Sequence, residues 1–134
     1  MDKVQTSTPA NTMTPLGPYR HISKVGEFIT IGGTAGVNPE TENLVGQDVG
    51  TQTIQILEAF EVMLASVDSD LNHVLHINVF LANMADFTEM NAAYAAKMGE
   101  ISPARTAIGV TGLPKSGARV TMNLTAVTKG GSTP

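Results

Sequence analysis

The sequence predicts an α+β fold in which two helices cover one face of a mixed sheet, in the order β-β-α-β-α-β-β. Three observations carry this prediction. Apolar residues recur at helical spacing in two segments, about 48–67 and about 86–98. Short runs rich in β-branched and aromatic residues lie between and beside these segments. Glycine, proline and asparagine separate the runs, as is typical of turns.

The first two strands are expected to form a hairpin. Phe28-Ile29-Thr30-Ile31 is a short β-branched and aromatic run that ends at Gly32-Gly33, and residues 19–25 are expected to pair with it. Asn38-Pro39-Glu40-Thr41 then has the composition of a turn. The chain is therefore expected to leave the sheet there and enter a helix.

Each helix has a recognisable start. Asp48 is a plausible N-cap for a helix that ends near Val67, and Asp86-Phe87-Thr88-Glu89 resembles a capping box. The stripe of the first helix leaves four polar residues mostly outward: Gln52, Gln55, Glu58 and Glu61. The inner face of the second helix is expected to carry Phe87, Met90, Tyr94 and Met98.

Three further strands are expected at 74–81, about 104–110 and 119–127. In the last of these, Val120, Met122, Leu124 and Ala126 point one way. Arg119, Thr121, Asn123 and Thr125 point the other way. The polar side fits either a solvent-exposed sheet face or the lining of a wet interface between subunits, and the pattern alone leaves both open.

The length fits one domain, because 134 residues with 42% hydrophobic content suffice for a single core. We expect a flexible N-terminal segment at 1–15, a single domain at 16–128 and a flexible tail at 129–134. The first segment is rich in Thr, Ser and Pro and has no apolar core, so it predicts neither a signal peptide nor a membrane span. A cytoplasmic protein is the expectation.

Charge and composition exclude several classes of partner. The net charge is −4 and no Lys/Arg cluster occurs, which argues against nucleic acid and anionic membranes as partners. The chain has no cysteine, so it has no disulfide, thiolate nucleophile or cysteine-ligated metal. The expected partners are small molecules or further copies of the chain.

No metal or cofactor is expected. His73 and His76 are three residues apart on a predicted strand, so they point to opposite faces and do not form a metal pair. The glycines at 32–36 lack the lysine and the spacing of a phosphate loop. His21 could reach a cleft and act as an acid or base, although an exposed strand histidine is the simpler interpretation.

The run 102–110, with Pro103-Ala104-Arg105 at its start and Leu113-Pro114-Lys115 after it, resembles the RidA/YjgF family, whose members hydrolyse reactive enamines and imines. Further matching segments are Gly17-Pro18-Tyr19, Ile29-Thr30-Ile31-Gly32-Gly33, Val37-Asn38-Pro39, Val79-Phe80-Leu81 and Asn91-Ala92-Ala93-Tyr94. The resemblance implies a chorismate-mutase-like fold and a homotrimer with three ligand clefts between subunits. It also implies that the polar sheet face turns toward the assembly.

The resemblance makes Arg105 the carboxylate anchor, a role that suits a guanidinium because it forms two parallel charge-assisted hydrogen bonds. Without the resemblance, an arginine paired with an acidic residue at a strand end is the simpler interpretation. Tyr19 and Asn91 match positions that line the family cleft. They could instead be a hairpin aromatic and an amide that satisfies a buried backbone group. Gly32 and its neighbour could offer backbone amides to a carboxylate, or could simply form a turn.

The chain departs from the family pattern at three positions. Thr121 stands where well-studied members carry a glutamate that positions the hydrolytic water, and no Asp or Glu follows Glu100. Ala107 stands where many members have cysteine, and Gly32 where many have serine. A threonine hydroxyl can hold a water, but it is a far weaker base than a carboxylate.

The sequence is compatible with two functions, one enzymatic and one not. The first is an enamine or imine deaminase that releases ammonia and a 2-oxo acid, with Arg105 and Thr121 catalytic and with Tyr19, Gly32, Asn91 and Arg105 binding the substrate. The second is a non-catalytic homotrimer that binds small carboxylates in the same cleft and acts as a sensor, a chaperone-like scaffold or a pathway accessory protein.

Overall fold

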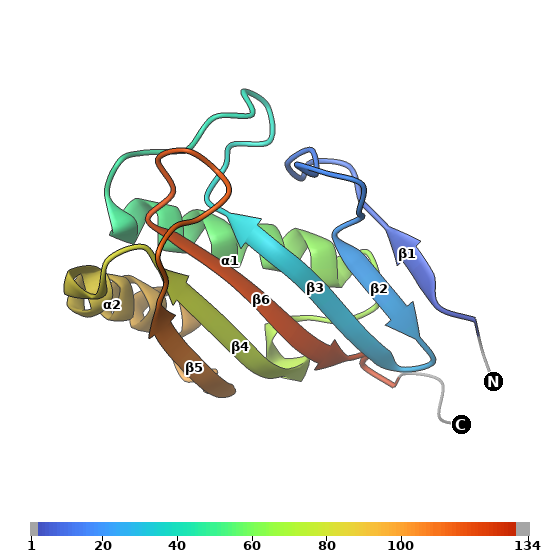
Figure 1. The fold of residues 1–134 in the computed structure, drawn as a ribbon. Coiled ribbons are helices and arrows are strands. Elements are labelled where there is room, and N and C mark those ends of the chain that lie inside the picture. The colour runs from blue at the N-terminus through green and yellow to red at the C-terminus, as the bar shows by residue number, and fades with distance from the viewer. Residues whose placement is uncertain (1–2, 131–134) are drawn as a thin grey trace.

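The computed structural model describes residues 3–130 and shows one six-stranded sheet with two helices on one face (Figure 1). The strands are β1 (Gln5–Ser7), β2 (Ile22–Val25), β3 (Phe28–Ala35), β4 (Val74–Leu81), β5 (Ala104–Gly109) and β6 (Val120–Val127). The helices are α1 (Val49–Ala65) and α2 (Phe87–Met98), with short 3₁₀ turns η1 (Leu71–His73) and η2 (Met84–Asp86). The predicted α+β class and mixed sheet are confirmed.

The strand order across the sheet is β1-β2-β3-β6-β4-β5. β4 and β5 are parallel and are joined through α2, whereas all other neighbouring pairs are antiparallel. β1 is a strand that the sequence did not predict, and it lies within the expected flexible segment 1–15, where Gln5 pairs with Lys24 of β2. Residues 1–2 and 131–134 of the two expected flexible ends lie outside the described residues.

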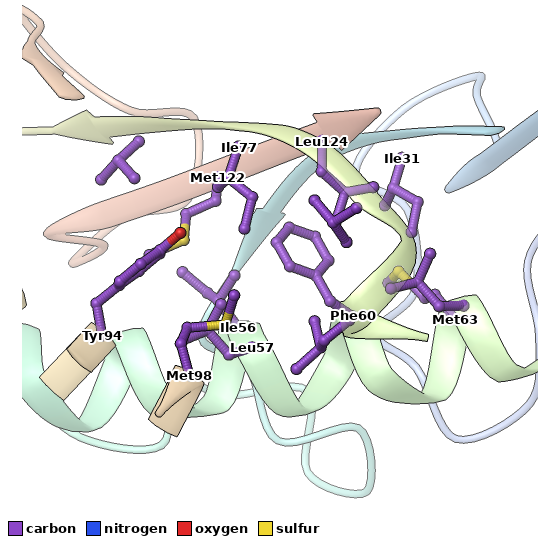
Figure 2. Packing of buried hydrophobic residues seen from close by; sticks show 14 of the residues in the cluster. Ile31, Ile56, Leu57, Phe60, Met63, Ile77, Tyr94, Met98, Met122 and Leu124 are labelled. Carbon is purple, nitrogen blue, oxygen red and sulfur yellow. The ribbon is translucent and has the colours of Figure 1, made fainter. Parts of the chain in front are cut away.

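The core lies between the sheet and the helices (Figure 2). Phe60 of α1 is completely buried and points toward the sheet, where Ile31, Met122 and Leu124 face the helices. Burying an aromatic or aliphatic side chain of this size contributes about 1.5–3 kcal/mol. Because neighbouring residues of a strand point to opposite faces, this burial fixes Thr121 on the open face of the sheet.

The open face is polar, as the alternation of the last strand predicts. Asn78 of β4 donates to the side-chain oxygen of Asn123 on β6 at 2.9 Å. His76 Nε2 lies 3.0 Å from the hydroxyl of Thr106. His73 is not on the strand as predicted, because it belongs to η1 and its Nδ1 lies 2.6 Å from an Asp70 carboxylate oxygen.

The predicted cap of α1 is confirmed, whereas the capping box of α2 is wrong. The Asp48 carboxylate accepts a hydrogen bond from the Thr51 backbone N–H at 2.8 Å. Asp86 makes no such bond, because its carboxylate lies 3.1 Å from Arg119 Nη1. Glu89 accepts from the backbone N–H of Gly50 at 3.0 Å. These two carboxylates therefore tie the start of α2 to the sheet and to α1.

Neither a membrane-spanning helix nor a metal-binding cluster is found in the part of the chain that the structure describes. None of its helices has the length and apolar character needed to cross a bilayer. Within residues 3–130, no three His, Asp or Glu side chains gather closely enough to hold a metal ion.

Candidate functional site

Three loops, at 8–21, 36–48 and 110–119, rise at one end of the sheet (Figure 1). Between them and the strands lies a cavity of about 350 Å³, which we call the loop pocket. Its walls are mostly apolar. The lining residues are Met13, Leu16, Tyr19, Gly33, Ala35, Phe80, Pro114, Lys115 and Thr121.

The structure brings two of the predicted site residues, Tyr19 and Thr121, into this pocket. Thr121 lies on the open face of β6, where it pairs with Phe80 of β4. The Tyr19 hydroxyl accepts a hydrogen bond from the backbone N–H of Leu16 at 3.1 Å, which fixes the ring at the pocket wall. Two hydroxyl groups that are far apart in the sequence thus line the same cavity.

Gly32 and Gly33 lie at the register shift between β3 and β6. The Gly32 amide donates to the backbone oxygen of His21 at 2.9 Å, so the expectation that this amide is free for a ligand carboxylate is wrong. A Cβ built at Gly33 would meet no atom within 4 Å, and one at Gly32 would meet only that His21 oxygen, at 3.9 Å. The two glycines leave open space beside the pocket.

His21 supports the pocket from behind and does not line it. Its side chain is buried, and Nε2 lies 2.6 Å from the backbone oxygen of Met13, so Nε2 carries the donated proton. The ring of Tyr19 meets the imidazole edge-on at 6.2 Å. The interpretation of His21 as an exposed strand histidine is therefore wrong.

Gln52 was predicted to point outward, yet it is fully buried beneath the loops. Its Nε2 donates to the backbone oxygens of Gly46 at 2.9 Å and Gly117 at 3.3 Å. Its Oε1 accepts from the backbone N–H of Arg119 at 2.8 Å. One side-chain amide thus joins two of the three pocket loops to α1.

Lys115 is the pocket residue that sequence reasoning missed as a functional candidate. Its Nζ donates to the backbone oxygen of Glu42 at 3.3 Å. The Glu42 carboxylate accepts from the backbone N–H of Thr14 at 2.9 Å, so all three loops are connected. The signal in the sequence is the Leu113-Pro114-Lys115 segment, one of the motifs that carry the family resemblance.

Arg105 lies on β5, away from the loop pocket, and faces the helix layer because it pairs in register with Ile77. The guanidinium carbon lies 4.7 Å from the centre of the Tyr94 ring and 5.8 Å from that of Phe87. Within residues 3–130, no carboxylate or other hydrogen-bond acceptor contacts it. The alternative of a structural ion pair at the strand end is therefore wrong, and the cation rests on aromatic rings instead.

Burial raises the pKa of the Tyr94 phenol above its ordinary value of 10.0, and the positive charge of Arg105 opposes this shift. Asn91 is exposed on α2, between the two aromatic residues in the sequence. The interpretation that it satisfies a buried backbone group is therefore wrong. We call Phe87, Asn91, Tyr94 and Arg105 the arginine edge.

The predicted site residues thus fall into two groups within one chain. Tyr19 and Thr121 line the loop pocket, with Gly32 directly beside it, whereas Arg105 and Asn91 belong to the arginine edge and are absent from its lining. β5 is also the last strand of the sheet, separated from β6 by β4. Within one chain, the loop pocket therefore contains no guanidinium, and Arg105 lies outside its lining.

Comparison with known proteins now identifies the family. A family model described as Endoribonuclease L-PSP matches residues 9–128. The chain belongs to the RidA/YjgF family. The solved structure of RidA from the Antarctic bacterium Psychrobacter sp. PAMC 21119 is similar, with a TM-score of 0.86 and 31% identity over 92% of this chain and 98% of that one.

Other members of the RidA/YjgF family match in sequence. A RutC family protein of Pyrococcus horikoshii is 40% identical over 105 residues, which cover 78% of this chain and 83% of that protein. The chloroplastic Reactive Intermediate Deaminase A of Arabidopsis thaliana is 34% identical over 99 residues, which cover 74% of this chain and 53% of that protein. The expected RidA-like fold is confirmed.

Proposed function

We propose that this chain is an enamine or imine deaminase that acts on small reactive intermediates bearing a carboxylate. The observation that carries the proposal is the unpaired guanidinium of Arg105, which lies 4.7 Å from the Tyr94 ring centre with no acidic partner in the described residues. A guanidinium that rests on ring faces keeps its in-plane N–H donors for a carboxylate. The name of the Arabidopsis relative, a reactive intermediate deaminase, supports the same class of reaction.

The proposed site lies between two copies of the chain in a homotrimer. One copy contributes Arg105 and Asn91, and its neighbour contributes Tyr19 and Thr121, with Gly32 leaving open space beside them. The separation of the loop pocket from the arginine edge supports this arrangement, because neither group is complete alone. Exposed apolar side chains on the sheet, Ile108 of β5 at 46% and Phe28 of β3 at 64%, support burial against another copy.

In the proposed reaction, water adds to the imine carbon and the C–N bond then breaks. The imine and one water become a 2-oxo acid and ammonia, and the departing nitrogen takes up both protons that the water loses. Arg105 holds the carboxylate beside the imine, while the Tyr19 and Thr121 hydroxyls and the Asn91 amide orient the water. No carboxylate or imidazole lines the loop pocket, so the role of these residues is to position the water, and they do not act as a strong base.

The lack of a carboxylate or imidazole in the lining of the loop pocket favours a second candidate function. This candidate is a non-catalytic trimer that binds small carboxylates as a pathway accessory protein. The two candidates differ in what Thr121→Glu does. For a deaminase, the added carboxylate can accept a proton from water and raise turnover. For a binding protein, the added negative charge weakens carboxylate binding, and there is no turnover to change.

The decisive assay generates 2-iminopropionate in situ with an amino-acid oxidase and follows the release of ammonia. A deaminase accelerates this release over buffer, and Arg105→Ala reduces the acceleration by about tenfold or more because the anchor is lost. Arg20→Ala is the matched control, since it removes an exposed guanidinium whose one hydrogen bond within residues 3–130 is to the Thr6 backbone oxygen, at 3.4 Å. No acceleration by the unmodified protein across several imines would move the assignment to carboxylate binding.

A mixing experiment tests the shared site. Arg105→Ala and Tyr19→Ala proteins are each dissociated, mixed and reassembled. If the two residues act from different copies, some sites of the mixed trimers receive an intact Arg105 and an intact Tyr19, and function returns. Recovery that never exceeds the average of the two variants would place both residues in one chain. Sedimentation equilibrium of the unmodified protein should give three times the chain mass.

RNA cleavage is not proposed, although the family model is described as an endoribonuclease. The loop pocket offers no acid–base pair for that reaction, and a net charge of −4 opposes a polyanion. A cytoplasmic location stays a prediction from the sequence.

A further inference from the structure

The loop pocket holds a cation of its own, Lys115. We propose that Lys115 is a second anion anchor, so that the site selects imino acids with an additional acidic group on a side chain of one or two methylenes. This inference rests on the proposed function, because it assigns Arg105 of a neighbouring copy to the carboxylate beside the imine and Lys115 to the distal acidic group.

The ammonium group of Lys115 has free capacity for a ligand. It donates one hydrogen bond, to the Glu42 backbone oxygen at 3.3 Å, and an ammonium has three donors. Within residues 3–130, it forms no salt bridge, unlike Lys97, whose Nζ lies 2.8 Å from the Glu61 carboxylate. No acidic side chain lines the pocket to neutralise it. An anionic group that enters the pocket therefore finds a positive charge that forms no salt bridge within the described residues.

The position of Lys115 is fixed from both sides. Its backbone oxygen accepts from the N–H of Ala118 at 3.0 Å, which closes a turn, and Gln52 holds Gly117 within that turn. The oxygen that Nζ contacts belongs to Glu42, which has the uncommon left-handed φ of +63°. Glu42 is held there by its own N–H bond to the Asn38 backbone oxygen at 2.8 Å. The side chain is thus held at the pocket wall and is not a free surface lysine.

The surroundings favour a small anion with an apolar body. Met13, Leu16, Phe80 and Pro114 supply apolar wall to the pocket that Lys115 also lines, and charge pairing is stronger beside such groups than in open water. The volume of about 350 Å³ is near the lower end of the range of roughly 300–1,000 Å³ for ligand pockets. A dicarboxylic imino acid of four or five carbons suits this size and polarity.

The neutral residue at position 121 fits the same assignment. A carboxylate there would stand in the pocket with Lys115, compensate its charge and repel a second acidic group. Thr121 leaves the cation uncompensated and offers a hydroxyl donor instead. For 2-iminosuccinate, the proposed reaction consumes one water and yields oxaloacetate and ammonia, with both carboxylates unchanged.

Equilibrium binding tests the anchor without requiring turnover. Succinate and butyrate have the same carbon chain and differ in one carboxylate, and calorimetry measures their affinities for the unmodified protein and for Lys115→Met, Lys115→Arg and Arg105→Ala. Lys115→Met should weaken the binding of succinate by about tenfold relative to that of butyrate, since one charge-assisted hydrogen bond is lost. Lys115→Arg should restore most of the preference, and Arg105→Ala should weaken both ligands. Lys24→Met, which removes a charge from β2 outside the loop pocket, should leave the preference for succinate unchanged.

Three results would overturn the inference: equal weakening of both ligands by Lys115→Met, no preference for succinate in the unmodified protein, or no binding of either ligand. A turnover assay then separates the two proposals, with 2-iminosuccinate generated by an aspartate oxidase and compared with 2-iminopropionate. Selective succinate binding without acceleration of either imine would defeat the deaminase and leave the anchor standing. If the protein accelerates the hydrolysis of both imines and Lys115→Met leaves the preference for succinate over butyrate unchanged, the anchor is defeated and the deaminase stands.

Discussion

The loop pocket and the arginine edge hold their polar groups by different physical means. In the loop pocket, hydrogen bonds to backbone atoms fix Tyr19, at nearby Leu16, and Lys115, at distant Glu42. Gln52 and Glu42 join the loops. At the arginine edge, the guanidinium of Arg105 rests on the rings of Phe87 and Tyr94 with no hydrogen bond in the described residues. The polar groups of the loop pocket are therefore positioned by hydrogen bonds, and the guanidinium of the arginine edge is positioned by contacts with aromatic rings.

This difference predicts which changes each region tolerates. A hydrogen-bonded loop fails when one buried amide is lost, because several backbone groups then lose their partners together. A ring platform tolerates the loss of a hydroxyl but not the loss of the ring. Variants of Tyr94 and Gln52 therefore separate the two regions.

The largest effect is expected from Tyr94→Ala. Tyr94 is 8% exposed and packs in the core, so its truncation should lower the free energy of unfolding by about 3–5 kcal/mol. It also removes the ring that lies nearest to Arg105. Urea denaturation measures the first effect, and carboxylate affinity measures the second.

The matched control is Tyr94→Phe, which keeps the ring and removes a buried hydroxyl that has no hydrogen-bond partner in the described residues. It should be as stable as the unmodified protein or more so, with Arg105-dependent ligand binding retained. A loss of stability in Tyr94→Phe close to that in Tyr94→Ala would show that the hydroxyl, and not the ring, supports the edge.

The next effect is expected from Gln52→Leu, which keeps the approximate volume but leaves the Gly46 and Gly117 oxygens and the Arg119 N–H without this partner. The free energy of unfolding should fall by about 2–3 kcal/mol. Hydrogen exchange should show lost protection at the Arg119 amide. Gln55→Leu is the control, because Gln55 donates a single bond, to the Val37 oxygen at 3.2 Å, and should cost about 1 kcal/mol or less. Equal costs for the two variants would contradict the role of Gln52 as the joint of the loops.

Gln52 also shows where prediction from the sequence stops. Helical periodicity placed α1 and its apolar stripe correctly, because both are local patterns. The partners of Gln52 lie in loops up to 67 positions along the chain, and no local pattern encodes them. A polar residue on a helix normally faces solvent, and the prediction that Gln52 points outward followed from that tendency. It failed because the buried backbone groups at this position need an amide as hydrogen-bond partner.

Other outcomes have the same physical explanation. The strand 74–81 was predicted with its observed bounds because its alternation and β-branched content are local. β1 was missed because Gln5-Thr6-Ser7 has no apolar alternation and becomes a strand only by pairing with β2. The sequence identified Tyr19, Thr121 and Arg105 as candidates, but their division into two regions depends on strand order and on the face that each strand presents.

A smaller effect tests the contact at the arginine edge by titration. Burial raises the pKa of Tyr94 above 10.0, and the charge of Arg105 lowers it by a smaller amount. Arg105→Ala should therefore raise the pKa of Tyr94 further, which ultraviolet difference spectra in alkaline solution can follow. The chain has two tyrosines, so Tyr94→Phe assigns the signal by removing it. An unchanged or lower pKa in Arg105→Ala would mean that the cation does not lie over this ring in solution.

The smallest effect concerns Asp48, which caps α1 where the loop 36–48 ends. Hydrogen bonds from the Thr51 backbone N–H and hydroxyl hold the pKa of Asp48 below its ordinary value of 3.8. The folded state therefore resists protonation of this carboxyl group. Its contribution to stability is present above the ordinary pKa and is lost as the pH falls through the folded pKa.

Asp48→Asn keeps an oxygen that can cap the helix but cannot titrate. Between about pH 5 and about pH 2, the melting temperature of the unmodified protein should fall more steeply than that of Asp48→Asn. Glu40→Gln, at an exposed turn carboxylate, is the charge-matched control and should follow the unmodified protein. Parallel curves for Asp48→Asn and the unmodified protein would mean that titration of the Asp48 carboxyl group does not contribute to stability in this pH range.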